Sequence, residues 1–414
     1  MQTIFINISQ LVGVSESSEL KRGQALRQLN VIEDAFLIIE EGLIQHYGKM
    51  FELDLLMPEI PPHAIDASGR VIMPAWCDSH THIVFAGSRE NEFIDKLHGL
   101  SYAEIAAKGG GILNSAKKLR ETSEDELYEQ AAQRLTELMR LGTGAIEIKS
   151  GYGLTIEAEL KMLGVIGRLQ KNFPVEIKAT FLGAHAYPIE FSNNKEGYVS
   201  LIINQMLPQV ADQGIASYVD VFVETGFFSP DQAIKICEAA DKFCLRPKLH
   251  VNQLNSIGGI ETGIKGNALS LDHLETMTEN DIALMGNFKG CATLLPTPAF
   301  YLRMQYQPAR ALINAGAAVT LASDFNPGSS PSGNMNFVAA LSCIQMKMFP
   351  EEVINAATIN GAFAMGAESS VGSITKGKKA NIIYTKKIPN YAYLFYSFAH
   401  DHIENVMIAG HWVR

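Results

Sequence analysis

Two histidines separated by one residue, His80 and His82, are the side chains of this sequence whose spacing first indicates chemistry. They follow a short apolar run, 71–73, that is typical of a β-strand. Residues i and i+2 of a strand point to the same face, so both imidazoles could reach one point in space, as two ligands of one metal ion must. Taken alone, the pair could equally be two surface histidines in a turn.

Three more histidines and one aspartate each stand at the carboxyl end of a separate apolar run. They are His185, His250, His273 and Asp324. A single histidine in such a place is more often a satisfied core residue, but packing gives no reason for several to gather at strand ends. Imidazole and carboxylate ligands without thiolates suit Zn²⁺ or a non-haem Fe ion, and the residue types do not separate the two metals. The fourth strand offers Glu224 but no lysine, so we expect one metal ion per subunit rather than a lysine-bridged pair.

The elements that must position these residues alternate between strands and helices. The expected strands are the run before His80 and residues 145–150, 178–185, 218–224, 247–250, 268–273, 291–296 and 318–324. Ser123 with Glu126 predicts a capped helix running to residue 139, a second helix lies near 157–170, and Ser229 followed by proline predicts the start of another. Eight strands alternating with helices predict an α/β fold of the (β/α)₈ type, in which catalytic residues lie at the carboxyl ends of the strands.

The two ends of the chain resemble each other and differ from the middle. Residues 35–44 have the pattern of a strand, a glycine turn and a second strand, and residues 372–384 and 405–413 have the same character. We therefore expect two domains: a metal-dependent (β/α)₈ barrel over residues 71–371, and a small composite β-sandwich built from residues 1–70 and 372–414.

The composition restricts the possible partners. The 414 residues are 47% hydrophobic and 19% charged, with a formal net charge of −10 and no basic tract, which argues against nucleic acid or an anionic membrane as a partner. The five cysteines show no paired spacing, so we expect free thiols in a reducing cytoplasm. The N-terminus has no signal-like segment and no apolar run is long enough to span a bilayer. We expect a cytoplasmic homodimer that acts on a small molecule.

Several motifs together resemble the amidohydrolase superfamily: the His80–His82 pair, single histidines on the fifth and sixth strands, and Asp324 on the eighth. Longer stretches resemble the imidazolonepropionase family within it, over nearly the whole chain. They are residues 85–93, 109–112, 147–154, 180–185 and 322–330, and those around Arg89, Tyr152 and Asn326 are the family-specific ones. This resemblance implies a barrel with a terminal β-sandwich and the metal-dependent hydrolysis of the cyclic amide of 4-imidazolone-5-propanoate to N-formimino-L-glutamate, a step of histidine degradation.

The resemblance also implies a role for each candidate residue. The metal ligands would be His80, His82, His250 and Asp324, and the residues in contact with substrate would be Tyr152, His185, Asn326, Gly328 and Ser329. Arg89 would bind the propionate carboxylate with its planar fork. His273 would polarise the ring carbonyl or shuttle a proton, with Asp324 taking the proton from water.

Each of these roles has a structural alternative. Arg89 could form a surface ion pair with Glu90 or Glu92, and Tyr152 could serve packing alone. Gly328 could be needed only for a turn, so that just its backbone faces a ligand. His273 could orient a metal ligand instead of moving a proton.

Gln253 departs from the family pattern, because some relatives carry glutamate at this position. A glutamine cannot usefully accept a proton, so we expect Gln253 only to hydrogen-bond substrate or water. The general base would then be Asp324, His273 or His185.

Two other functions remain open at this stage. One is a deaminase or cyclic amidase acting on a neutral ring, which would have no need of the carboxylate clamp offered by Arg89. The other is a metal-binding barrel that has lost catalysis. The presence of all four metal ligands together with His273 argues against that second reading.

Overall fold

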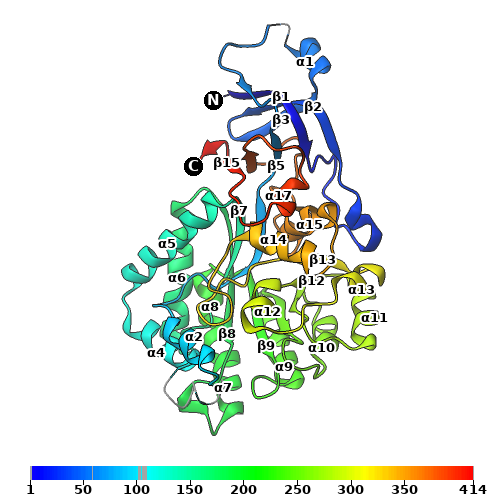
Figure 1. Cartoon of the computed structure of the whole chain (residues 1–414). Helices are drawn as coiled ribbons and strands as arrows, with labels where there is room; N and C mark the ends of the chain where they lie inside the picture. The colour runs from blue at the N-terminus through cyan, green and yellow to red at the C-terminus, as the bar shows by residue number, and fades with distance from the viewer. Residues whose placement is uncertain (1, 58, 101–103, 105–109, 414) are drawn as a thin grey trace.

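The computed structural model describes residues 2–57, 59–100, 104 and 110–413, and it contains two separate β-sheets (Figure 1). Eight parallel strands lie in chain order in one of them: β6 (Trp76–Thr81), β7 (Thr143–Lys149), β8 (Glu176–Ala184), β9 (Tyr218–Val223), β10 (Arg246–Val251), β11 (Ser270–His273), β12 (Cys291–Leu294) and β13 (Ala318–Leu321). The ends of this sheet meet where the backbone N–H of Asp324 donates to the carbonyl of His80 at 2.9 Å. The predicted (β/α)₈ barrel is confirmed, and the seam that closes it runs through candidate site residues.

Helices cover the outside of the barrel. They are α2 (Glu90–Leu97), α4 (Ile112–Glu121), α5 (Glu124–Arg140), α6 (Ile156–Asn172), α7 (Lys195–Leu201), α8 (Leu207–Gln213), α9 (Pro230–Asp241), α10 (Gly259–Lys265), α11 (Glu279–Asn287), α12 (Pro296–Leu302), α13 (Ala309–Asn314), α14 (Met335–Ile344), α15 (Pro350–Ala357) and α16 (Ile359–Phe363). The two predicted helix starts are confirmed. The Ser123 hydroxyl caps α5, and Ser229 caps α9 with proline in the first turn. None of the helices in the described residues is both long and apolar enough to cross a membrane.

The second sheet is mixed and joins both ends of the chain. Its strands are β1 (Gln2–Val12), β2 (Val31–Glu40), β3 (Leu43–Lys49), β4 (Ile65–Asp66), β5 (Val71–Pro74), β14 (Ile382–Thr385), β15 (Ile403–Ile408) and β16 (His411–Trp412). They lie in the order β16-β15-β14-β5-β1-β2-β3, with β4 paired to β1, beside the short helices α1 (Met50–Leu56) and α17 (Tyr393–Tyr396). The expected β unit built from both termini is confirmed.

One strand lies in a different sheet from the one we predicted. We expected residues 71–73 to form the barrel strand that precedes His80, but Val71–Pro74 is β5 of the terminal sheet, paired with β1 and β14. The first barrel strand is β6, which begins at Trp76 and contains His80 itself. Only Ala75 separates β5 from β6. The two strands belong to different sheets, but in the sequence they follow one another without a visible break.

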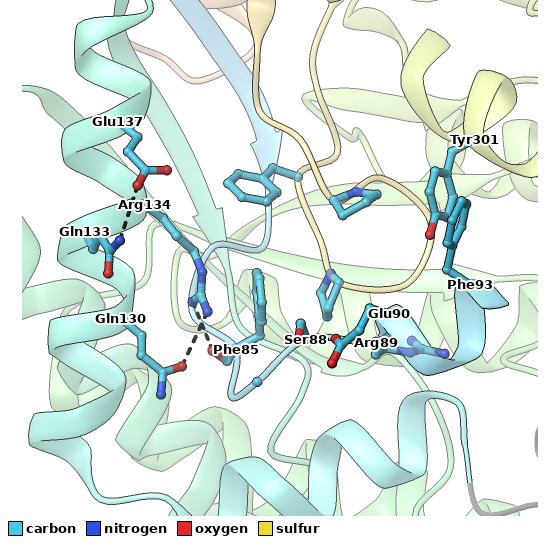
Figure 2. A pocket seen from close by; sticks show the side chains of 14 residues that line it. Phe85, Ser88, Arg89, Glu90, Phe93, Gln130, Gln133, Arg134, Glu137 and Tyr301 are labelled. Carbon is cyan, nitrogen blue, oxygen red and sulfur yellow. Dashed lines mark hydrogen bonds between the residues drawn. The ribbon is translucent and has the colours of Figure 1, made fainter.

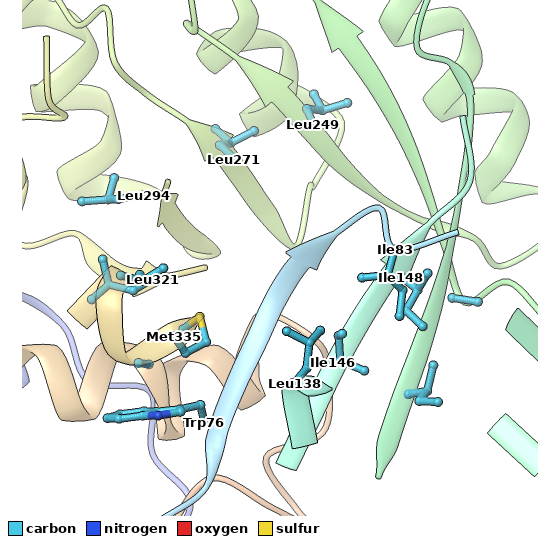
Figure 3. Packing of buried hydrophobic residues seen from close by; sticks show 14 of the residues in the cluster. Trp76, Ile83, Leu138, Ile146, Ile148, Leu249, Leu271, Leu294, Leu321 and Met335 are labelled. Atoms are coloured by element: carbon cyan, nitrogen blue, oxygen red, sulfur yellow. The ribbon is translucent and has the colours of Figure 1, made fainter. Parts of the chain in front are cut away.

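An apolar layer packs between the barrel strands and the helices. Leu249 and Leu271, on neighbouring strands, are fully buried members of this layer (Figure 3). Because side chains alternate along a strand, Lys248 and His250 point to the face opposite Leu249, which is the barrel interior. Lys248 indeed reaches the Glu147 carboxylate of β7 across that interior. The fold therefore buries charged side chains beneath the carboxyl ends of the strands.

Candidate active site

Four predicted metal ligands and His273 gather at the carboxyl ends of the barrel strands. The ligand atoms of His80, His82 and His250 all lie within 4.8 Å of one another, as do those of His80, His273 and Asp324. Atom Oδ1 of Asp324 is 3.5 Å from Nε2 of His80 and 3.4 Å from Nε2 of His82. All five side chains are buried. The fold thus brings together the residues that the sequence placed at separate strand ends.

The unpartnered atoms of this cluster fit a metal ion. Nε2 of His80, Nδ1 of His82 and both ring nitrogens of His250 are buried without a hydrogen-bond partner among the described residues. Buried polar atoms are nearly always satisfied, so unpartnered nitrogens on three clustered imidazoles indicate a ligand that completes the site. Imidazoles with one carboxylate are donors typical of catalytic zinc and non-haem iron sites.

Carboxylates hold two of these histidines from behind. Nδ1 of His80 lies 2.7 Å from Oδ2 of Asp272, and because an ionised carboxylate only accepts, Nδ1 carries the proton and Nε2 is left as the donor to a metal. Nδ1 of His250 lies 3.0 Å from Oδ2 of Asp220 but is not aligned for a hydrogen bond. The Asp220 carboxylate therefore acts on the His250 ring through its charge. Sequence analysis missed both aspartates.

A fully buried group of charges lies beneath them. The ammonium of Lys149 is 2.6 Å from Oε1 of Glu147 and 2.9 Å from Oδ2 of Asp220. Burial alone would lower the pKa of Lys149, but Asp220 and Glu147 outweigh it and raise that pKa above its ordinary value, so the lysine is charged. Lys248 donates to the other oxygen of Glu147 at 2.5 Å. Sequence analysis missed these residues too, although charges at alternate positions of an apolar strand, as in Glu147 and Lys149, were a visible signal.

His185 follows β8 and stacks on His82, with ring centroids 5.4 Å apart. Its Nδ1 lies 3.0 Å from the carbonyl oxygen of Gly151, which can only accept, so Nδ1 carries the proton and Nε2 is an acceptor. Desolvation by the surrounding protein lowers the pKa of His185 to about 3, which keeps the ring neutral. Tyr152 packs edge-on against both histidines, and the Glu159 carboxylate accepts backbone N–H groups on either side of Tyr152.

Arg89 lies at the start of α2, with its guanidinium held by Glu92. Both Nε and Nη2 donate to Oε2 of Glu92, at 2.9 and 2.5 Å. The ion pair weighed in the sequence analysis therefore exists, but it is nearly buried rather than a surface pair, each side chain being 11% exposed. Nη1 lies over Gly328, since a Cβ added there would be 2.4 Å from it, and Lys96 donates to the Gly328 carbonyl at 3.2 Å.

Asn326 shapes the loop that follows β13. Its amide nitrogen donates to the Asp324 carbonyl and to the Ser329 hydroxyl, at 2.7 and 2.8 Å, and its amide oxygen accepts the N–H groups of Gly328 and Ser329. These four bonds use the whole hydrogen-bonding capacity of the amide. The side chain therefore has no bond left for a ligand, and the loop offers Ser329 Oγ instead, 3.3 Å from Oδ2 of Asp324.

His273 and Gln253 complete the set of predicted residues. Nδ1 of His273 lies 3.3 Å from Oε1 of the buried Glu275, which directs the other ring nitrogen towards the cluster. His273 and Asp324 both have left-handed backbone, with φ of 86° and 51°, an uncommon conformation for residues other than glycine. Within the described part of the chain, the Gln253 side chain makes no hydrogen bond, so its amide is free to meet a ligand.

The candidate residues line two adjoining cavities. A small one of about 60 Å³ is lined by His82, Tyr152, His185, Phe222, His250, Gln253, His273, Asp324, Asn326 and Ser329. A neighbouring cavity of about 510 Å³ shares six of these residues and adds Arg89, Lys96, Ile112, Phe227, Leu254, Leu302, Met304 and Gly328. The histidines and Asp324 thus lie at one end of a continuous site, and two cations lie at the other.

A larger cavity of about 710 Å³ lies on the other side of the Arg89 loop, between that loop and α5 (Figure 2). Its most prominent charged group, Arg134, is already engaged: the guanidinium donates to the carbonyls of Ile83 and Phe85 and packs on the Phe85 ring. No member of the histidine cluster lines this cavity. We therefore place the active site in the two smaller cavities.

Comparisons with known proteins agree with this geometry. The sequence matches the amidohydrolase family over residues 71–413. An imidazolonepropionase of Flavobacterium johnsoniae is 56% identical over 412 residues, covering 99% of both chains, and one of Flavobacterium psychrophilum is 52% identical over 411 residues, again covering 99% of both. A solved adenosine deaminase from Xanthomonas campestris with bound zinc covers 99% of this chain and 92% of its own, with a TM-score of 0.68 at 15% identity, a likeness of fold alone. The chain belongs to the amidohydrolase family and, within it, to the imidazolonepropionases.

Proposed function

We propose that this protein hydrolyses the cyclic amide of 4-imidazolone-5-propanoate to N-formimino-L-glutamate. The observation that carries this proposal is how the side chains are distributed in the site. Imidazole and carboxylate groups that could bind a metal ion lie at one end, and two cations lie at the other. A substrate with one hydrolysable ring and one carboxylate on a short flexible arm matches both ends. The relatives named imidazolonepropionase support the same reaction.

Arg89 and Lys96 would receive the propionate carboxylate. The Nη1 atom of Arg89 remains available, because Glu92 occupies the opposite edge of the guanidinium, and Gly328 leaves space beside it. Lys96 adds a second positive charge to the same cavity. Glu92 neutralises only one of these two positive charges, so a neutral ring would leave the cavity with an excess positive charge, which argues for a carboxylate substrate.

His80, His82, His250 and Asp324 would hold one Zn²⁺ or Fe ion per subunit. Such an ion, when bound, supplies the Lewis acidity that makes water a nucleophile at neutral pH. Asp324 lies among these donors, where its carboxylate can take a proton from the attacking water. His273, at the carboxyl end of β11, is placed to hand a proton to the ring nitrogen that leaves.

The substrate ring would be oriented by the neutral residues of the site. The Nε2 acceptor of His185 suits a ring N–H group of the substrate, while Tyr152 fixes the plane of the His185 imidazole. The free amide of Gln253 can donate or accept at the ring carbonyl or nitrogen but cannot act as a base. Ser329 offers a hydroxyl beside Asp324.

We further propose a cytoplasmic homodimer. All five cysteines are free, which suits a reducing compartment. Light scattering on the purified protein tests the dimer directly, and a monomeric mass would contradict it.

The decisive test of substrate class uses Arg89→Met with two substrates, imidazolonepropionate and an imidazolone that lacks the carboxylate. Loss of a charge-assisted contact costs about 1.5–3 kcal/mol, so kcat/KM should fall roughly 10- to 100-fold for imidazolonepropionate and little for the analogue. Arg168→Met, which removes a partly exposed arginine of α6 that lies outside both cavities, is the matched control. Equal losses for both substrates would show that Arg89 serves the fold rather than the substrate.

A further inference from the structure

We infer that Lys149 is a positioning residue for the metal ligands: its ammonium fixes Asp220 and Asp272, and these two carboxylates orient His250 and His80. The inference rests on the proposed metal site. It concerns residues of strands β7, β9 and β11 that lie beneath the site and touch no substrate.

Lys149 lies at the centre of two parallel relays, each of which runs from its ammonium through a carboxylate to an imidazole that we propose as a metal ligand. Its Nζ lies 2.9 Å from Oδ2 of Asp220, the same oxygen that is 3.0 Å from Nδ1 of His250. It also lies 3.6 Å from Oδ2 of Asp272, the oxygen that is 2.7 Å from Nδ1 of His80. One ammonium therefore hydrogen-bonds the carboxylate behind His250 and forms an ion pair, without a hydrogen bond, with the carboxylate behind His80.

All of these side chains are fully enclosed, apart from 3% exposure at His250. A buried ammonium is costly unless its partners satisfy it, and an apolar residue of similar volume would often serve stability equally well. Carboxylates behind ligand histidines fix the tautomer and the direction of the ring, which is a role that an apolar replacement cannot fill.

The charges of this region also favour a cation at the site. Buried carboxylates outnumber buried lysines: Lys149 and Lys248 stand against Glu147, Asp220, Asp272 and Asp324, and Asp78 and Glu275 are buried beside them. Charge balance alone could therefore explain why a lysine is buried here. The test must separate that explanation from positioning.

Lys248 provides the matched control. It is as buried as Lys149 and carries the same charge, but its Nζ donates to Glu147 and to the carbonyls of Ser79 and Ala364. It makes no hydrogen bond or ion pair with Asp220 or Asp272 within the described residues, although its charge, like that of Lys149, lowers the pKa of Asp272. Removal of either lysine changes the net charge equally, whereas only removal of Lys149 breaks both relays.

The experiment measures Zn²⁺ affinity of the apoprotein by competition with a chromophoric chelator, and the visible absorption of the Co²⁺-loaded protein as a reporter of ligand geometry. Lys149→Met should weaken Zn²⁺ binding roughly 10- to 100-fold, the usual cost of losing an orienting partner, and should alter the Co²⁺ bands. Lys248→Met should stay close to wild type in both readouts.

The double variant Lys149→Met/Glu147→Gln restores the wild-type net charge without restoring the contacts to Asp220 and Asp272. It should bind Zn²⁺ as weakly as the single variant, and it keeps the test decisive if the single variant does not fold. Recovery of wild-type affinity in the double variant, or an unchanged Co²⁺ spectrum in Lys149→Met, would overturn the inference. His82→Ala separates this result from the proposed function: unchanged Zn²⁺ affinity there would refute the metal site itself.

Discussion

Two nitrogens of Arg89, Nε and Nη2, donate to the same carboxylate oxygen of Glu92, at 2.9 and 2.5 Å, within a nearly buried ion pair. The second Glu92 oxygen accepts the backbone N–H of Gly111 at 2.9 Å, so the pair is fixed to the chain at two places. A guanidinium held in this way does not have to be ordered when a carboxylate arrives, and the binding free energy that ordering would cost is saved. The arginine that we propose to bind the substrate carboxylate is therefore held in place before the substrate enters.

Replacing Glu92 by glutamine tests this arrangement. Glu92→Gln keeps the size of the side chain but loses the charge that holds Arg89, so we expect kcat/KM for imidazolonepropionate to fall by roughly 10-fold, the lower end of a lost charge-assisted contact. Steady-state kinetics with thermal unfolding as a control measures the effect. A lower KM in the variant would mean that Glu92 competes with the substrate for Arg89, contrary to our account.

Gly328 gives a second test of the same end of the site. In Gly328→Ala the new methyl group would stand 2.4 Å from Nη1 of Arg89, so the guanidinium must move. We expect a clear fall in kcat/KM with little change in melting temperature, because the φ of this glycine does not require glycine. Residues in contact show coupled effects, so the alanine substitution should cost nothing more in an Arg89→Met background. Additive losses in the double variant would refute the contact.

His273 is expected to act in proton transfer. His273→Ala should lower kcat by about 10²–10⁴, the usual scale of general acid–base catalysis, while the protein keeps its metal. Metal content is measured on the same samples by elemental analysis. A metal-replete variant with near wild-type kcat would leave Asp324 or His185 as the only candidates for that proton.

Gln253 should contribute to binding rather than to proton transfer. Its amide has no partner within the described residues, so Gln253→Ala should raise KM by the equivalent of one hydrogen bond, about 1 kcal/mol, with kcat nearly unchanged. Gln253→Glu should keep most of the activity, because the base lies elsewhere. If the glutamate variant were many times faster than wild type, the proton path that we propose would be incomplete.

The barrel could be predicted from the sequence because apolar strands alternate with helices and several strands end at a chemically unusual residue. His250, His273 and Asp324 each stand at the end of an apolar run, and the barrel geometry brings strand ends together. The boundary between the sheets could not be predicted. Val71–Pro74 and Trp76–Thr81 are both extended and only Ala75 separates them, so nothing local shows that they join different sheets.

The network of buried charges could not be predicted for a different reason. Lys149, Asp220 and Asp272 lie on strands far apart in the sequence, and although the alternation of Glu147 and Lys149 marks a strand with buried charge, nothing local shows which residues pair with it. Only the closed barrel shows that they satisfy one another. Asn326 is a different case: its motif predicts a substrate contact, which stays a prediction, and its amide is engaged in local hydrogen bonds that a sequence does not reveal.

The most direct test of the account is hydrolysis of 4-imidazolone-5-propanoate by the purified protein, followed as loss of substrate absorbance with N-formimino-L-glutamate identified as the product. The account predicts turnover that disappears when the protein is stripped with a chelator, returns when Zn²⁺ or Fe²⁺ is added, and is absent in His82→Ala. Metal-replete wild-type protein that leaves this substrate untouched, or a chelated protein that retains full activity, would contradict it.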